Sequence, residues 1–398
     1  MRQGVFPRLN EGTVNHELDW QRSQNRYGNP EKAVVAMSGG VDSSVAAYLL
    51  KNSGFDVIGV TMQVWPVINE GPSLPRTCCS LGAINDARNI AWSLGFPHYV
   101  LNFREPFERM VVDPFISEYL AGRTPNPCVA CNKHIKFNLL LRRTAELGAR
   151  WLVTGHYARV FYSLEHNRYL MLRGIDDQKD QSYFLYMLTQ DQLSRILFPL
   201  GGLRKSQVRD IARKVGLKVA AKPESQEICF IPDGDYRNFV NERRPGAARP
   251  GPIVNTEGKV LGEHSGVHHY TIGQRRGLGL ALGRPVYVVA LDPAENTVVV
   301  GDKEDLETGA FTTTENNFIL FDRLTGPVEV EVKIRYTTPV VKGVIAPLED
   351  GRVLVRLSEP QTAITPGQAA VFYRGDLVIG GGTIERSLKQ TPHSGFSY

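Results

Sequence analysis

A short run of glycines and hydroxyl residues, Met37-Ser-Gly-Gly-Val-Asp-Ser-Ser-Val45, is the segment of this sequence best suited to chemistry. It lies between an apolar run and an amphipathic segment, which predicts a strand, a turn and a helix. The two glycines let the backbone bend sharply, and the free amides at the start of the helix would face an anion. An ordinary glycine turn capped by Asp42 or Ser43 is the alternative. Because the string lacks the Gly-Lys-Ser/Thr ending of a Walker loop, transfer of a terminal phosphoryl group is not the predicted reaction.

The cysteines are the second chemical signal. All five, Cys78, Cys79, Cys128, Cys131 and Cys229, lie in the first 230 residues, which does not fit a secreted disulfide scaffold. The sequence predicts that Cys131 lies where a helix begins and near Lys133, and both features would favour the thiolate. A thiolate is the form that attacks a persulfide or a disulfide.

A metal site built from these cysteines is an open alternative. Zinc usually needs four ligands, and the sequence has no second Cys-x-x-Cys pair, so no zinc site is expected. Cys128, Cys131 and Cys229 could instead hold three irons of an iron–sulfur cluster.

The elements that would position these residues alternate between strands and helices. Strands are expected at 33–37, 57–64, 98–103 and 151–154, with helices at 42–51, 83–94 and 132–147. This alternation predicts a doubly wound parallel α/β sheet covered on both faces. In such a sheet the ligand lies at the C-terminal ends of the strands.

The composition and the patterning of the sequence change after Cys229. The segment 232–282 is rich in Gly, Pro, Arg and His, and from Phe311 onward the chain reads almost entirely as β-structure, with strict alternation over Val328–Arg335. We therefore predict an N-terminal extension (1–30), an α/β domain (31–228), a small β-rich central domain (229–310) and a C-terminal β-barrel (311–398).

Composition and charge bound the functional class. The net charge of +5 is modest, but basic residues gather at 204–214, 243–249 and 275–276, which suits a polyanionic partner. No apolar run approaches the roughly 20 residues of a membrane-spanning helix, and the first 31 residues lack the apolar core of a signal peptide. A cytoplasmic protein without membrane contact, and a monomer, is expected.

Several separated motifs resemble one enzyme family. The loop at 37–45 looks like the pyrophosphate-binding loop of the N-type ATP pyrophosphatases, which attach AMP to a carbonyl oxygen and release pyrophosphate. Beyond the loop, the sequence resembles the tRNA-specific 2-thiouridylases in their characteristic order of motifs. These motifs lie at 122–137, 155–159, 179–185, 225–230 and 270–277.

The resemblance implies ATP-dependent 2-thiolation of the wobble uridine in tRNAs for Lys, Glu and Gln. Cys229 would carry a persulfide received from a sulfur donor protein, a cysteine desulfurase or a relay protein. Cys131 would be the nucleophile that frees the sulfur, forming a transient disulfide with Cys229. Asp42 would help to hold Mg2+ on the ATP phosphates, because a hard cation prefers carboxylate and phosphate oxygens.

The same resemblance implies two further sets of binding residues. ATP would be bound by Ala36, Met37, Ser38, Gly39, Gly40, Val41, Asp42, Ser43, Met62 and Gly155. The tRNA would be bound by Asn126, Pro127, Cys128, His156, Lys179, Asp180, Gln181, Arg335, Tyr336 and Gln368, the first three facing the target base.

One residue departs from the family pattern, and two alternative functions stay open. Many members of the family have Asp where this sequence has Cys128, so a carboxylate base is missing here. An amidating or argininosuccinate-forming ligase on the same loop would need no paired cysteines. A non-catalytic RNA-binding protein would need neither cysteines nor ATP turnover.

Overall fold

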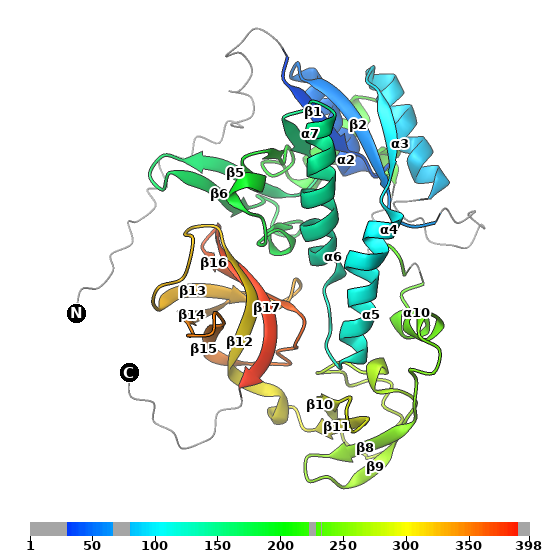
Figure 1. The fold of residues 1–398 in the computed structure, drawn as a ribbon, viewed down its shortest axis with the longest axis vertical. Helices are drawn as coiled ribbons and strands as arrows, with labels where there is room; N and C mark the ends of the chain where they lie inside the picture. Colours follow the sequence, from blue (N-terminus) through cyan, green and yellow to red (C-terminus); the bar gives the residue numbers. More distant parts are fainter. Residues whose placement is uncertain (1–29, 67–79, 223–227, 232, 389–398) are drawn as a thin grey trace.

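The computed structural model describes residues 30–66, 80–222, 228–231 and 233–388. Cys78 and Cys79 lie outside the described residues, as does the predicted extension 1–30 except for its last residue. Figure 1 shows an α/β part at the top, a barrel below it, and a small β-rich part at the bottom. No helix among the described residues is long and apolar enough to cross a membrane.

A five-stranded parallel sheet forms the α/β part. Its strand order is β3-β2-β1-β4-β7. The strands are β1 (Lys32–Ala36), β2 (Asp56–Gln63), β3 (His98–Asn102), β4 (Trp151–Val153) and β7 (Ile196–Leu197). The chain order reverses between β1 and β4, so the ligand position expected for a doubly wound sheet is the gap at their C-terminal ends.

Helices cover both faces of this sheet, as predicted. On one face, α2 (Val41–Asn52), α3 (Leu81–Leu94) and α9 (Lys205–Lys214) share a hydrophobic cluster with Val35 and Val57. On the other face, Val34 and Val60 share a cluster with η1 (Glu108–Val112) and α5 (Asp113–Leu120), which the sequence reading did not foresee. The central strand β1 is apolar on both sides because both sides are covered, whereas the edge strand β3 exposes Tyr99 and Val100.

The helix that carries the cysteines starts earlier than predicted. The sequence favoured a start at Asn132, whereas α6 (Pro127–Ala130), η2 (Cys131–Leu140) and α7 (Leu141–Glu146) follow one another without a break. The Asn126 side chain accepts a hydrogen bond from Val129 N at 3.2 Å and caps the helix, with proline in its first position. Cys131 therefore lies one turn inside the helix, where the helix dipole favours a thiolate less than at the start.

The small central part is a four-stranded sheet of order β10-β11-β8-β9. Its strands are β8 (Gly251–Asn255), β9 (Val260–His264), β10 (Tyr287–Asp292) and β11 (Thr297–Gly301). Before it, α10 (Tyr236–Arg243) buries Val240 in the same cluster as Phe230 and α5, so this helix packs on the α/β part.

The C-terminal part is a closed six-stranded barrel, in the order β12-β15-β14-β13-β16-β17 with β17 pairing back to β12. The strands are β12 (Glu307–Phe318), β13 (Val328–Lys333), β14 (Val341–Pro347), β15 (Val353–Thr362), β16 (Ala369–Arg374) and β17 (Leu377–Leu388). The predicted alternation is confirmed, because Val328, Val330 and Val332 are buried and Glu329 is exposed.

Two features of the barrel differ from the predicted division of the chain. The predicted boundary between residues 310 and 311 falls inside β12, which pairs with barrel strands from Glu307 onward. In addition, the hairpin of β5 (Ala158–Ser163) and β6 (Arg168–Arg173) comes from the α/β segment but pairs with β17 through Leu172 and Leu377. The α/β part and the barrel are thus joined by a strand pairing.

Candidate active site

The glycine loop joins β1 to α2 at the C-terminal edge of the sheet. Gly40 is the residue before the first helical turn, and no side chain caps the helix there. The first amides of a helix have no partner within the helix, so they are left available to an anion. Hydroxyls brace the turn: Ser43 Oγ accepts from Ser38 N at 3.2 Å, and Ser44 Oγ donates to Gly40 O at 2.7 Å.

Two glycines allow neighbouring backbone to approach this loop closely. Gly39 has φ of +67°, and a Cβ at that position would lie 2.2 Å from Ala83 O at the start of α3. Gly155, after β4, would place a Cβ 2.9 Å from Asp42 C and Ser43 N. The loop is therefore seated between α3 and the turn after β4, at the switch point of the sheet.

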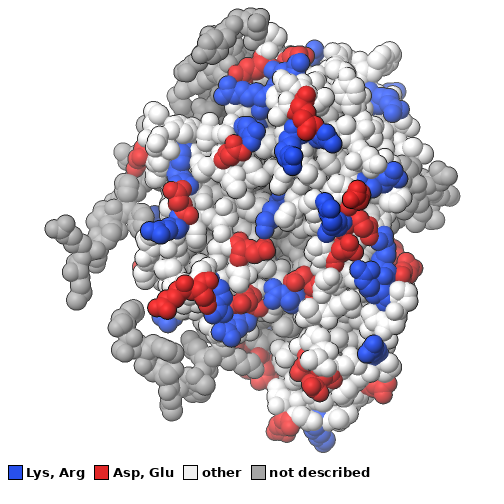
Figure 2. Space-filling model, in the orientation of Figure 1, with Lys and Arg blue, Asp and Glu red and all other residues white. Residues whose placement is uncertain are grey.

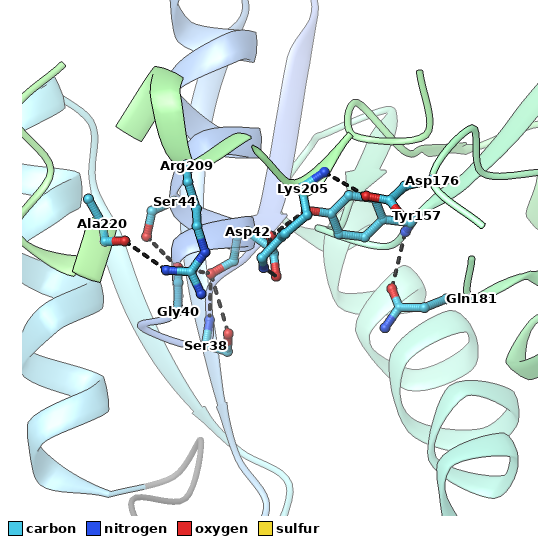
Figure 3. A network of polar contacts seen from close by, with 11 residues as sticks. Ser38, Gly40, Asp42, Ser44, Tyr157, Asp176, Gln181, Lys205, Arg209 and Ala220 are labelled. Carbon is cyan, nitrogen blue, oxygen red and sulfur yellow. Dashed lines mark hydrogen bonds and ion pairs between the residues drawn. The ribbon is translucent and has the colours of Figure 1, made fainter. Parts of the chain in front are cut away.

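Two lysines and a tyrosine contact the loop and the start of α2. Lys205 Nζ, at the start of α9, donates to both carboxylate oxygens of Asp42 at 2.7 Å, and Tyr157 Oη donates to Asp42 Oδ1 at 2.7 Å. Figure 3 shows Asp42 and Lys205 facing each other from two helices, with the ring of Tyr157 beside them. Lys222 Nζ donates to Gly39 O and to Asp86 Oδ2, each at 3.0 Å.

Sequence reasoning missed Lys205, Lys222 and Tyr157. Lys205 was placed within a basic surface patch, although its residue is 8 % exposed. Tyr157 stands inside a motif already noted at 155–159, but the motif alone gives no partner for it. All three contacts join segments more than 100 residues apart, and no local pattern signals such a contact.

The remaining residues expected to bind ATP divide into side chains that face the core and backbone at the sheet edge. Met37 and Val41 are buried, and the backbone of Met37 is fixed by its N–H to Val60 O and by Thr61 Oγ1 to its carbonyl, both at 2.8 Å. Ala36 and Met62 are partly buried at the ends of β1 and β2.

The three described cysteines are free thiols. Cys131 and Cys229 are partly buried and pack against the same hydrophobic cluster as Ala36 and Met62. Cys128 is exposed, but surrounding protein atoms raise the pKa of its thiol, an effect that Lys136 partly opposes. The helix start thus does not make Cys128 a ready thiolate.

The arrangement does not fit a metal cluster on these thiols. Within the described residues, which include all three of Cys128, Cys131 and Cys229, no group of three or more His, Cys, Asp or Glu side chains is placed to hold a metal ion. Near the loop, Asp42 is the carboxylate expected to hold Mg2+, and both of its oxygens already accept from Lys205. A magnesium ion bound directly to Asp42 would have to share these oxygens with the Lys205 ammonium.

Several residues expected to touch tRNA are engaged within the protein. His156 is buried against Phe137 and Phe198, its Nδ1 lies 2.7 Å from Thr154 Oγ1, and burial lowers its pKa well below 6.5. The carboxylate of Asp180 is also buried and accepts from Gly174 N, Ser182 N and Ser182 Oγ. Their contact with tRNA stays a prediction, and such burial favours a positioning role.

Gln181 and Lys179 lie beside these residues. Gln181 Oε1 accepts from Tyr157 N at 3.1 Å, which connects it to the Asp42 network in Figure 3. Lys179 is half-buried, and its backbone N–H donates to Asp176 O at 2.9 Å.

The barrel residues expected to touch tRNA gather where the three parts meet. Gln368 Nε2 donates to Thr124 O at 2.9 Å and to Pro125 O at 3.3 Å, so it fastens the segment that leads to Asn126, Pro127 and the cysteines. Arg335 Nη2 donates to Thr365 Oγ1 at 2.8 Å, and both side chains line a cavity of about 410 Å3 with Gln368 and residues 271–274. Tyr336 packs on Phe184, with ring centroids 4.7 Å apart.

Charge alone does not mark an RNA-binding face. Figure 2 shows Lys and Arg intermingled with Asp and Glu over the visible face. In the patch at 243–249, Arg243 contacts Glu108 and Arg244 lies 3.3 Å from Asp113. By contrast, Arg275 and Arg276 are exposed, and no carboxylate of the described residues forms an ion pair with them.

Comparisons with known proteins identify the family of the chain. Three family models match consecutive parts of the chain: "tRNA methyl transferase HUP domain" over residues 31–233, "tRNA methyl transferase PRC-barrel domain" over 237–302, and "Aminomethyltransferase beta-barrel domain" over 308–384. Solved structures also align with about half of the chain, including NMN synthetase from Francisella tularensis (18% identity, 52% of this chain and 71% of that chain, TM-score 0.32). A likeness this low carries no argument about function.

Curated relatives match nearly the whole chain. The tRNA-specific 2-thiouridylase MnmA of Moorella thermoacetica is 55% identical over 352 residues, covering 88% of this chain and 99% of that protein. The protein of the same name from Desulforamulus reducens is 52% identical over 361 residues, covering 90% of this chain and 98% of that protein. With this identity over most of both chains, and with the HUP-domain model matching about half of the sequence, the chain belongs to the tRNA-specific 2-thiouridylase family.

Proposed function

We propose that this protein activates a tRNA uridine with ATP at the glycine loop and then replaces the 2-oxygen with sulfur carried by its own cysteines. The observation that supports this most directly is the shared packing of the two sites. Ala36 and Met62, at the ends of β1 and β2, pack on the same hydrophobic cluster as Cys131 and Cys229. Both thiols therefore pack on the cluster that reaches the strand ends next to the loop, whereas Met37 and Val41 of the loop itself pack on the cluster that covers the other face of the sheet.

In the first step, uracil O2 attacks the α-phosphorus of ATP, and pyrophosphate leaves. The free amides at the start of α2 suit the negative charge that develops on the pyrophosphate. The loop's close seating against Ala83 and Gly155 keeps these amides in place without further reorganisation. The product is a 2-O-adenylated uridine, whose AMP group leaves more readily than oxide.

In the second step, the persulfide on Cys229 supplies the sulfur. The Cys131 thiolate attacks the inner sulfur of the persulfide, a disulfide between Cys131 and Cys229 forms, and the outer sulfur is released as hydrosulfide. The hydrosulfide attacks C2 of the uridine and AMP leaves. The disulfide must then be reduced by an external thiol before the next turnover.

The chain length between anchors limits how far Cys229 can lie from the loop. Lys222 donates a hydrogen bond to Gly39 O, and Cys229 lies seven positions after Lys222 (229 − 222 = 7). Seven extended residues span at most about 25 Å. Cys229 thus stays within reach of the nucleotide site by its covalent connection.

The tRNA would be held across the three parts. Arg335 and Gln368 from the barrel meet residues 271–274 of the central part at one cavity, and Gln368 also fastens the approach to Asn126. Unpaired bases are recognised by stacking and by hydrogen bonds to their edges, which this mixture of donors suits. The wobble uridine of tRNAs for Lys, Glu and Gln is the proposed target, with a cysteine desulfurase or a relay protein as sulfur source.

Mass spectrometry of tRNA nucleosides tests the proposal. Unmodified tRNA is incubated with ATP, Mg2+ and a persulfide donor, and 2-thiouridine and AMP are measured. We expect 2-thiouridine from the wild type and none from Cys131→Ser or Cys229→Ser, which should still release pyrophosphate when ATP and tRNA are both present. Full turnover by the double Cys131→Ser/Cys229→Ser variant would instead favour a ligase.

A parallel measurement addresses the iron–sulfur alternative. Anaerobic purification followed by visible absorption and iron analysis should show no cluster, because the thiols are not placed to share a metal. Stoichiometric iron that is lost in Cys128→Ser would refute this expectation.

A further inference from the structure

The ion pair between Lys205 and Asp42 is the feature that the expected roles of the loop leave unexplained. The side chains of Lys205 and Asp42 are 11% and 31% exposed, and the ammonium contacts both carboxylate oxygens at 2.7 Å. A direct Mg2+ ligand would need at least one of these oxygens. The carboxylate thus already has a cationic partner that the protein itself supplies.

The position of the pair places Lys205 beside the anion site. Asp42 is the second residue of α2, in the helical turn whose free amides would face the phosphates of ATP. Lys205 comes from α9, and its own N–H donates to Asp176 Oδ2 at 2.8 Å, which fixes the start of that helix. Tyr157 holds Asp42 from the other side through its hydroxyl at 2.7 Å.

We infer that Lys205 binds the ATP phosphates and that Asp42 is a positioning residue, which holds the Lys205 ammonium beside the start of α2. The inference rests on the proposed ATP-dependent function. Mg2+ would then arrive on the nucleotide, and Asp42 would not be its ligand. A lysine fixed by a carboxylate loses little conformational freedom when it meets a phosphate, so the site is organised before ATP arrives.

Binding of α,β-methylene-ATP, which cannot release pyrophosphate, tests the inference without tRNA or sulfur. Calorimetry should show that Lys205→Met weakens binding about 10- to 100-fold, the loss expected for a charge-assisted hydrogen bond. Lys205→Arg should retain most of the affinity. Lys214→Met, an exposed lysine at the other end of α9, is the matched control and should bind as the wild type does.

The double variant separates the two roles of Asp42 by the sign of its effect. Without Lys205, the Asp42 carboxylate is an unpaired negative charge beside the phosphates, so adding Asp42→Asn to Lys205→Met should restore part of the affinity. If Asp42 bound Mg2+, the same addition would weaken binding further. The Mg2+ concentration for half-maximal binding should also be unchanged in Asp42→Asn.

Three results would overturn the inference: unchanged binding in Lys205→Met, weaker binding in the double variant than in Lys205→Met, or a raised Mg2+ requirement in Asp42→Asn. Melting temperatures are measured for all variants to check that they are folded. The double variant lacks both charges of the Lys205–Asp42 pair and so leaves neither of them unpaired. Failure of the proposed function would look different, because the wild type would bind the nucleotide and yet form no 2-thiouridine.

Discussion

The seat of the glycine loop on α3 gives a quantitative prediction. In Gly39→Ala, the new Cβ would lie 2.2 Å from Ala83 O, well below any distance that real Cβ atoms show, and the atom that must give way is backbone. The left-handed backbone of Gly39 costs an alanine about 1–2 kcal/mol, and relief of the overlap costs about 1–3 kcal/mol more. The total is about 2–5 kcal/mol.

Comparison with Gly95→Ala separates the cost of the overlap from the cost of the left-handed backbone. Gly95 ends α3 with φ of +71°, and a Cβ there would meet no atom within 4 Å. This control therefore carries only the cost of the left-handed backbone. The difference between the two variants, about 1–3 kcal/mol, corresponds to roughly 5- to 150-fold in an equilibrium constant.

Two assays are needed because the overlap can be relieved in two ways. If α3 moves, thermal unfolding shows a larger loss for Gly39→Ala than for Gly95→Ala. If the loop moves, calorimetry shows weaker ATP binding for Gly39→Ala alone. The reasoning is refuted if Gly39→Ala and Gly95→Ala agree in both melting temperature and ATP affinity.

Three further predictions address tRNA and pH. Gln368→Leu removes the donor to Thr124 O and should lower 2-thiouridine formation about tenfold while ATP binding stays at the wild-type value; equal losses in both would contradict it. Replacing the exposed Arg275 and Arg276 by Ala should weaken tRNA binding and reduce the slope of log K against log salt by about 1–2, measured by filter binding; Arg284→Ala, which breaks a pair with Asp302, should leave that slope nearly unchanged. Burial lowers the pKa of His268 to about 4, so the unfolded chain binds more protons than the folded protein between pH 6.5 and 4. The protein should therefore lose stability as the pH falls through that window. In His268→Asn the melting temperature should fall less over the same window, and equal pH profiles for the variant and the wild type would argue against this reasoning.

The α/β sheet was predictable because its signals are local. Each strand buried on both faces appears as an apolar run, and the glycine string between Ala36 and Val41 can hardly be anything but a tight turn. The helix that carries the cysteines is an exception, because its predicted start at residue 132 is five residues later than its observed start at Pro127. Asn126 as a cap with a proline directly after it is a helix start signal that the prediction did not use.

The contacts that distinguish the site were not predictable, since each joins segments remote in sequence. Lys205 pairs with a residue 163 positions earlier, and Gln368 fastens a carbonyl 244 positions earlier. From the sequence alone, Lys205 looks like a member of a solvated basic patch, and Gln368 looks like part of an ordinary turn. Family resemblance named Gln368 without showing what it holds in the protein.

These remote contacts fasten the two thiols to different sites. The segment that ends at Cys229 starts from Lys222, which is bound to the carbonyl of Gly39 in the nucleotide loop. The segment that leads to Cys131 is bound by Gln368 to the barrel. In the proposed mechanism the two thiols must meet, so sulfur transfer would depend on how the α/β part and the barrel are held together. The pairing of Leu172 in the β5–β6 hairpin with Leu377 in β17 joins those two parts directly, so in that mechanism the hairpin would help to align the cysteines.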